Sequence, residues 1–219
     1  MRFLIFAILS SASIALVLKL FRAQKGNRYG ILLGTYLTCV LIDDDKIIAS
    51  YSRECFKKQS EEVFNALEEV FDQAGISRKS IDAICVSEGP GSYTGVRIAM
   101  TIAKVIGELL PCEVYKISTL RLYAANRNDC MVVMDARANR VYCGIYDGDL
   151  VVMDDLAMEI KDIDVGDYKI VGDGSLLGKE NDYGDIPVAF LATRHLWEKV
   201  DDISYLVPKY LKESETYYR

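Results

Sequence analysis

The chain has 219 residues, of which 51% are apolar and 26% charged, and its formal net charge at pH 7 is −6. A chain of this length and composition is globular and forms one large domain or two small ones, which excludes a disordered protein. The acidic balance argues against a large nucleic-acid surface of its own, because affinity for phosphates comes mainly from Lys and Arg.

Residues 1–28 form an apolar N-terminal segment, in which the run 3–18 carries no charge and three serines. Three interpretations compete. The run forms two buried strands at 3–9 and 13–18, or an unusual cytoplasmic extension. Alternatively it is a membrane anchor through residues 1–22, although a span needs about 20 apolar residues. The third is a signal peptide, for which the cleavage site is poor.

From residue 29 the pattern alternates strands and helices, and we assign residues 29–111 to a first α/β lobe. Strands are predicted at 31–33, 37–42 and 47–51, with a polar turn at 43–45. Residues 60–74 predict a helix that Ser60 caps and Gly75 ends. Its apolar side chains form one stripe, which consists of Val63, Phe64, Leu67, Val70, Phe71 and Ala74.

A glycine-rich stretch follows the apolar strand-like run 81–86 and precedes a long apolar run. It predicts a sharp strand-to-helix turn, because glycine reaches backbone angles closed to other residues and proline fixes its own φ. The turn either binds an anion at the helix N-terminus or is a tight connection with nothing bound. Its residues are Gly89, Pro90, Gly91, Ser92, Tyr93, Thr94 and Gly95.

The helix predicted at 94–110 is apolar or small nearly all round, so we expect it to be buried on two faces. One face would cover a sheet and the other would lie against a second element. That element is a helix of the same chain or a partner chain, and the pattern fits both. The first face consists of Ile98, Ile102, Val105 and Leu109, and the second of Met100, Ala103, Lys104 and Gly107.

After Pro111 a second α/β lobe is predicted over residues 112–219. Its strands are expected at 114–117, 130–134, 141–146, 150–153 and 168–171, and its helices at 120–125 and 188–199. The connection 135–140 reads as a hairpin. Residues 147–185 hold twelve acidic side chains against three lysines, which indicates a solvated face or a surface for a basic protein partner.

The cysteines and the single histidine limit the kinds of site. The six cysteines show no CxxC pair and lie mostly in apolar strand-like runs, which fits a reducing compartment. His195 is the only histidine, and a zinc or iron site built on paired histidines needs two. We therefore expect no metal site, and we expect His195 to be a surface or half-buried packing residue of a helix.

Three blocks resemble the TsaB family, also called YeaZ, the accessory subunit of the bacterial machinery that makes threonylcarbamoyladenosine (t6A) in tRNA. Residues 89–98 match the family's GPGSFTGxRI signature, with Tyr93 in place of Phe. Residues 134–142 resemble its DAR…VY hairpin, and residues 207–211 resemble its PxYL segment. The N-terminus departs from the family, because neither 7–11 nor 34–36 keeps the Asp of the usual Asp-Thr-Ser opening.

The resemblance implies a two-lobed α/β fold of the actin-like (ASKHA) type with a degenerate nucleotide site, since a metal–nucleotide site needs the missing carboxylate. It implies a cytoplasmic, non-catalytic scaffold without a catalytic residue, metal or cofactor of its own. The scaffold would pair with a TsaD-like catalytic subunit, with ATP and metal on partner subunits. A TsaE-like ATPase would belong to the complex, tRNA would be contacted only indirectly, and the chain would form a homodimer without its partner.

Family members pair through the two helices of their first lobe. The resemblance therefore places a partner interface on Val63, Leu67, Val70, Phe71, Arg97, Met100, Ala103, Lys104 and Gly107. Two alternatives stay open. One is an enzyme of the actin-like or glycoprotease-like class, either a peptidase or ATP-dependent, and the other is the same scaffold with a membrane tether.

Overall fold

The computed structural model describes residues 27–33, 36–55, 58–76 and 81–211. The expectations for the apolar N-terminal segment, including the strands at 3–9 and 13–18, lie outside these residues. Within the described part of the chain, no helix is both long and apolar enough to cross a bilayer.

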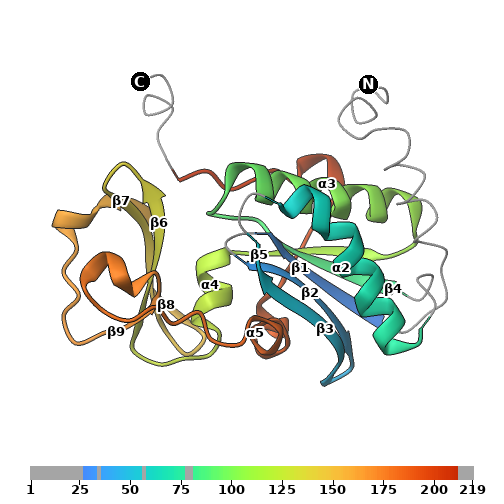
Figure 1. Ribbon diagram of the computed structural model, residues 1–219, viewed down its shortest axis with the longest axis horizontal. Coiled ribbons are helices and arrows are strands. Elements are labelled where there is room, and N and C mark those ends of the chain that lie inside the picture. The colour runs from blue at the N-terminus through green and yellow to red at the C-terminus, as the bar shows by residue number, and fades with distance from the viewer. Residues whose placement is uncertain (1–26, 34–35, 56–57, 77–80, 212–219) are drawn as a thin grey trace.

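A six-stranded sheet with the order β10-β5-β4-β1-β2-β3 forms the larger lobe (Figure 1). Its antiparallel meander consists of β1 (Asn27–Leu33), β2 (Tyr36–Asp43) and β3 (Lys46–Glu54). The strands β4 (Ile81–Ser87) and β5 (Glu113–Ile117) continue it in parallel from β1, and the short β10 (Glu198–Lys199) pairs with β5. The predicted strands and the turn at 43–45 are confirmed.

The smaller lobe is built on a four-stranded sheet with the order β8-β7-β6-β9. Its strands β6 (Cys130–Arg137), β7 (Arg140–Asp147) and β8 (Leu150–Glu159) are antiparallel, and β9 (Lys169–Gly172) runs parallel to β6. The short helices η1 (Ile160–Asp162) and η2 (Gly174–Leu177) flank β9 in the chain. The predicted hairpin at 135–140 is confirmed.

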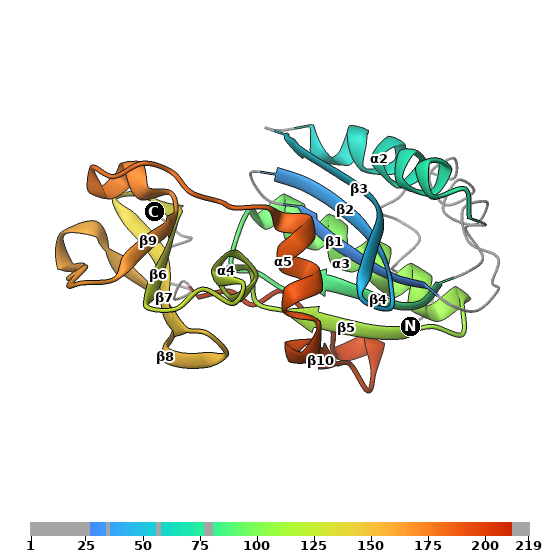
Figure 2. The ribbon, with the colours of Figure 1, turned by 90° about the horizontal axis from the view of Figure 1, so that it is seen from below.

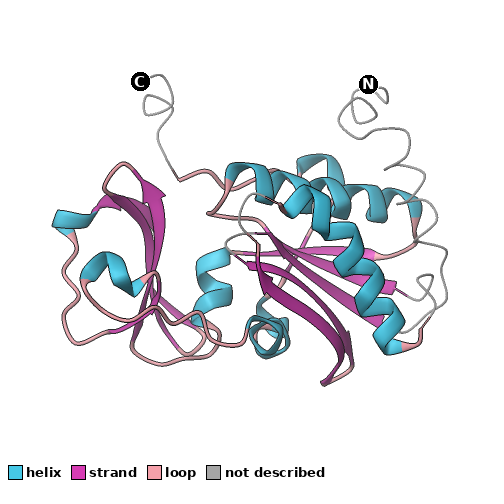
Figure 3. Cartoon of the chain, in the orientation of Figure 1, coloured by secondary structure: helices cyan, strands magenta, loops and turns pink. Residues whose placement is uncertain are grey.

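Helices cover both faces of the larger sheet (Figures 1, 2 and 3). The long α2 (Gln59–Ala74) and α3 (Tyr93–Leu109) pack on one face, and α5 (Ile186–Ala192) packs on the opposite face over β2 and β3. The short α4 (Thr119–Ala124) contacts β6 and β7 of the smaller sheet and also α5. It thereby joins the lobes.

The side chains of the central strands point alternately to the two faces of the sheet, so helices can pack on both faces. In β2, Cys39 and Leu41 join the core cluster under α2 and α3, whereas Val40 and Ile42 join the cluster of α4 and α5. All four side chains are fully buried. The larger sheet is therefore apolar on both faces.

The boundary between the lobes differs from the predicted break at Pro111. β5 follows Pro111 yet extends the larger sheet, so the chain crosses to the smaller sheet only after α4. Residues 186–211 return to the larger lobe, where α5 packs on β2 and β3 and β10 pairs with β5. Pro111 follows the end of α3, but the next strand, β5, still pairs with β4 of the larger sheet.

Two helix ends also differ from the prediction. α2 begins at Gln59, and the amides of Glu61 and Glu62 donate to the carbonyl of Lys58. Ser60 therefore lies inside the first turn instead of capping it. The helix predicted at 188–199 ends at Ala192, and a short helix η3 (Arg194–Leu196) follows before the chain extends to pair with β5.

Candidate partner-binding site

The glycine-rich turn between β4 and α3 is held by backbone hydrogen bonds to three other segments. The amide of Glu88 donates to the carbonyl of Ile117 (2.9 Å), and that of Thr119 donates to the carbonyl of Gly89 (2.9 Å). The amide of Lys209 donates to the carbonyl of Glu88 (2.8 Å). Gly89 adopts a φ of +103°, and a Cβ there would lie 3.0 Å from the Lys209 carbonyl oxygen. The turn is thus joined to β5, α4 and the C-terminal segment.

An internal ion pair lies beside this turn. The side chain of Glu88 is almost fully buried, and its carboxylate accepts a hydrogen bond from Lys116 Nζ at 2.9 Å. That hydrogen bond raises the pKa of Lys116, against the opposing effect of burial. At the start of α3, Ser92 Oγ caps the helix by accepting from the Gly95 amide (3.3 Å). Both alternatives for the turn, an anion site and a tight connection with nothing bound, stay predictions.

The C-terminal segment runs along α3, and we call residues 203–211 the C-terminal strap. Its first turn, η4 (Ile203–Tyr205), lies so close to Gly107 that a Cβ there would be 2.6 Å from Ile203 Cδ1. Lys104 Nζ donates to the carbonyl of Ser204 (3.3 Å), and Leu206 is buried in the core under α3. Lys104 and Gly107 of the predicted second face are therefore covered by this strap of the same chain.

The strap ends at the first turn of α3. Tyr210 stacks on Tyr93 with ring centroids 5.7 Å apart. The guanidinium of Arg97 lies 5.1 Å from the centroid of the Tyr93 ring, and its Nη1 donates to the Tyr93 hydroxyl (2.6 Å). The strap and the helix are thus antiparallel, and an exposed aromatic and cationic group marks their common end.

The predicted division of α3 into two faces is correct only in part, since Ile102 is buried as expected. Met100 and Ala103, expected on the outer face, are buried against the sheet. Ile98 and Val105, expected to be buried, are only partly so, and Leu109 is 46% exposed. Because both faces are apolar, periodicity did not show which one packs on β1 and β4.

Most of the predicted interface residues lie in the core of the chain. Arg97 is exposed and Lys104 half-buried, whereas Gly107 lies under the strap. The other six are at most 3% exposed, which commits them to packing within the larger lobe: Val63, Leu67, Val70, Phe71, Met100 and Ala103. The assignment of a partner interface to these two helices stays a prediction. Only the helix side chains that reach solvent could contact a partner directly.

Exposed apolar side chains gather along α3 and the strap. Of the ten large apolar side chains that are exposed among the described residues, five lie on these two elements. Exposed large apolar side chains that gather on neighbouring elements are typical of protein-binding sites. We call this set the helix–strap surface, and it consists of Tyr93, Leu109, Tyr205, Val207 and Tyr210. Sequence reasoning found the family segment at 207–211 but missed its position beside α3.

A buried carboxylate ties the strap to the smaller lobe. Asp155 of β8 has a side chain that is only 4% exposed, and its Oδ2 lies 3.2 Å from Lys209 Nζ. Ser118 Oγ donates to the same oxygen (2.5 Å), and the Tyr146 hydroxyl donates to Oδ1. Burial first, and then the charge of Asp155, raise the pKa of Tyr146. This cluster joins β7, β8, the start of α4 and the strap.

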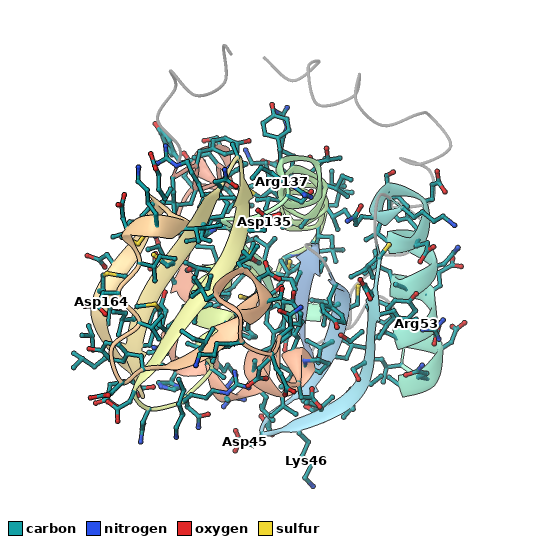
Figure 4. The ribbon with its side chains drawn as sticks, turned by 60° about the vertical axis from the view of Figure 1, so that its left-hand side comes forward. Asp45, Lys46, Arg53, Asp135, Arg137 and Asp164 are labelled. Atoms are coloured by element: carbon teal, nitrogen blue, oxygen red, sulfur yellow. The ribbon has the colours of Figure 1, made fainter. Side chains whose placement is uncertain are left out.

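Two other polar groups have structural partners. In the β6–β7 hairpin, Asp135 Oδ1 accepts from the Arg137 amide (2.8 Å), and the two side chains pair at 3.2 Å (Figure 4). His195 lies in η3 on the surface, where its Nε2 is 2.9 Å from Asp149 Oδ2. His195 is therefore a surface residue, one of the two alternatives that the sequence left open, but it lies in a short helix instead of the long one predicted.

A groove of about 640 Å³ follows the edge strand β3 between α2 and the start of α5. Arg53 on β3 projects beside α2 (Figure 4) and pairs with Glu69 of α2 at 3.6 Å. Gln73 donates to the same carboxylate at 3.1 Å. Arg53 and Glu69, which both line this groove, are thus paired with each other.

The two sheets, the crossover helices and the strap define a two-lobed α/β protein of the actin-like type. Two solved Pseudomonas aeruginosa structures share this fold. One is an uncharacterised protein with similarity to peptidase YeaZ, which is 18% identical with a TM-score of 0.73, and the match covers 85% of this chain and 100% of that chain. The other is YeaZ, which is 19% identical with a TM-score of 0.68, and the match covers 84% of this chain and 98% of that chain. The two-lobed α/β fold predicted from the sequence is confirmed, and the degenerate nucleotide site stays a prediction.

Sequence comparisons identify the family. The model of the family described as "TsaD: tRNA N6-adenosine threonylcarbamoyltransferase" matches residues 48–163. The "tRNA threonylcarbamoyladenosine biosynthesis protein TsaB" of Bacillus subtilis (strain 168) is 33% identical over 114 residues, which is 50% of each chain. The chain thus spans about half the length of the curated TsaB relatives that it matches. It belongs to this family, in its TsaB (YeaZ) group, as its sequence motifs predicted.

Proposed function

We propose that this chain is a non-catalytic scaffold subunit for t6A synthesis, and that it binds a TsaD-like catalytic subunit. The family membership supports the pathway, because its description and the names of its relatives both refer to threonylcarbamoyl transfer to tRNA adenosine. The helix–strap surface supports the binding role. It offers a partner apolar area on one side of the molecule.

The observation that carries the proposal is the concentration of exposed aromatic and aliphatic side chains along α3 and the strap. Tyr205 is 80% exposed and Val207 is 62% exposed, although both belong to a segment that is otherwise anchored in the core by Leu206. Aromatic side chains that are exposed yet held in place are typical anchors of protein interfaces. The partner would therefore contact the outer side of α3 together with the strap.

The same proposal places the reacting groups on other subunits. ATP and metal would reside on the partners, a TsaE-like ATPase would complete the assembly, and tRNA would be contacted indirectly. Cys55, Cys85, Cys112, Cys130 and Cys143 carry free thiols, which agrees with a cytoplasmic location. Without its partner, the chain would form a homodimer through the same apolar surface.

The test is co-purification with the TsaD-like subunit of the same organism. Leu109→Asp combined with Val207→Asp should weaken the complex at least about tenfold, because each change puts a charge into the apolar contact. Val188→Asp is the matched control, since Val188 is 50% exposed but lies on α5 over the opposite face of the sheet. The control should bind normally.

Two outcomes would contradict the proposal. Equal binding by the double variant and the control would remove the helix–strap surface as the interface. Hydrolysis of ATP, cleavage of peptides or formation of t6A by the isolated chain would show that it is an enzyme.

A further inference from the structure

The edge strand β8 exposes three consecutive apolar side chains at its start. Leu150 is 63% exposed, and Val151 and Val152 are each about half exposed. Among the described strands β8 pairs only with β7, so its outer edge is open. Tyr146 lies opposite Val151 and Ile145 opposite Met153, which leaves Val152 as an extra residue without a partner. This bulge turns the apolar run toward solvent.

Acidic side chains flank the run on both sides. Asp147 lies opposite Leu150 across the β7–β8 turn, and Asp149 directly precedes it. Asp154 follows two residues after Val152, and all three carboxylates are on exposed residues. The segment 147–185 holds twelve acidic and three basic residues, whereas the rest of the chain holds twenty acidic and twenty-three basic residues. The negative charge of the molecule is therefore concentrated in this lobe.

Charge decides what such a surface binds. A nucleic acid or an anionic membrane would meet carboxylates with phosphates, so both are repelled. A second copy of the chain would place the same aspartates against each other, which also costs free energy. A protein segment with Lys or Arg on either side of an apolar centre matches both the charge and the exposed side chains.

We propose that the start of β8, centred on Leu150, Val151 and Val152, binds a partner protein through a segment with an apolar centre and basic flanks. This β8 surface belongs to the smaller sheet, whereas the helix–strap surface belongs to the larger lobe (Figure 2). Bulges and charges also protect edge strands against aggregation, but that protection does not require three exposed apolar side chains in succession.

The experiment uses the full chain and a labelled peptide with a central leucine–valine–leucine run and a pair of lysines at each end. Fluorescence anisotropy should show binding that weakens as salt rises, because the flanking contacts are ionic. Asp147→Lys combined with Asp154→Lys should weaken binding about tenfold, and Leu150→Ser combined with Val152→Ser at least about fivefold. A peptide with glutamates in place of the lysines should not bind.

The matched control for charge is Asp162→Lys combined with Asp167→Lys. It makes the same change in net charge within the same acidic segment, but both residues lie beyond β8, on either side of Asp164 (Figure 4). This control should keep at least half of the wild-type affinity. Circular dichroism would confirm that every variant folds, as expected for substitutions at exposed positions.

Several results would overturn the proposal. They are failure of the wild-type chain to bind the peptide, an equal loss in the control variant, and unchanged binding after the apolar substitutions. Tighter binding to phosphatidylserine vesicles or to a short RNA would assign the surface to another class of ligand. A dimer that the Leu150→Ser and Val152→Ser changes dissociate would assign it to a second copy. None of these results depends on the partner of the helix–strap surface.

Discussion

Tyr210 near the C-terminus stacks on Tyr93 at the first turn of α3, with ring centroids 5.7 Å apart and ring planes 24° from parallel. Residues separated by more than half of the chain thereby fix the end of the strap on the glycine-rich signature turn. The signature of the family and its C-terminal segment form one structural unit.

The first prediction concerns this stacked pair. A double-mutant cycle of Tyr93→Ala and Tyr210→Ala should give a coupling free energy of about 0.5–1.5 kcal/mol, the range measured for aromatic pairs. Chemical denaturation measures it. Tyr205→Ala is the control, because Tyr205 is 80% exposed and its removal should leave the free energy of unfolding nearly unchanged. A coupling near zero would mean that the two rings do not hold the strap.

Gly107→Val should destabilise the chain and release the strap. The added side chain would overlap Ile203 and Val114, which both lie 2.6 Å from the position of its Cβ. Overpacking of this kind costs about 1–3 kcal/mol. Gly107 belongs to the partner interface predicted from the sequence, but the strap makes this change a structural one. Glu108→Val, at the exposed neighbouring position, should cost much less, and an equal cost would argue against the close contact.

The ion pair beside the signature turn predicts a dependence of stability on pH. Its hydrogen bond to Glu88 raises the pKa of Lys116, so folding favours the protonated ammonium. The stabilisation is complete below the ordinary lysine pKa of about 10.4 and is lost as the pH rises through the raised value. Glu88→Gln should therefore be less stable than the wild type at about pH 8, and the difference should narrow above about pH 11.

Glu198→Gln is the control for this measurement. Glu198 also pairs with Lys116, at 3.3 Å, but its side chain is 69% exposed. Its removal should change the pH profile less than the removal of the buried Glu88. A constant difference between wild type and Glu88→Gln at all pH values would show that the ion pair does not titrate as described.

Much of the fold was predictable because hydrophobic periodicity follows burial. The meander of β1, β2 and β3, the helix α2 and the β6–β7 hairpin all came from local patterns. The orientation of α3 did not, since Met100 and Leu109 are both apolar and only the position of the sheet distinguishes them. The strap has no helical or strand periodicity, so nothing in its local sequence showed that it covers α3. The helix predicted at 188–199 ended early because β10 pairs with β5, a contact that sequence-local patterns do not contain.

His195→Ala should leave t6A formation unchanged in a strain that depends on this chain. His195 is on the surface, and its one described partner is the exposed Asp149. A surface pair of this kind contributes about 0–1 kcal/mol to stability. Liquid chromatography of tRNA nucleosides measures the modification. Loss of t6A with a normally assembled complex would favour the enzyme alternative, because a positioned histidine is a common acid–base group.

Asp155→Asn should loosen the junction between the strap and the smaller lobe. The amide keeps the shape of the carboxylate but loses its charge toward Lys209, and one of its two positions becomes a donor facing the hydroxyl donors Ser118 and Tyr146. Loss of hydrogen bonds to a buried carboxylate costs about 1–3 kcal/mol. Asp154→Asn is a close control, because Asp154 precedes Asp155 in the chain and is exposed. Hydrogen exchange should show faster exchange of the Lys209 amide in Asp155→Asn alone, because that amide bonds to Glu88 only while the strap is in place. Equal exchange in the two variants would mean that the strap is held by α3 and the signature turn without help from the smaller lobe.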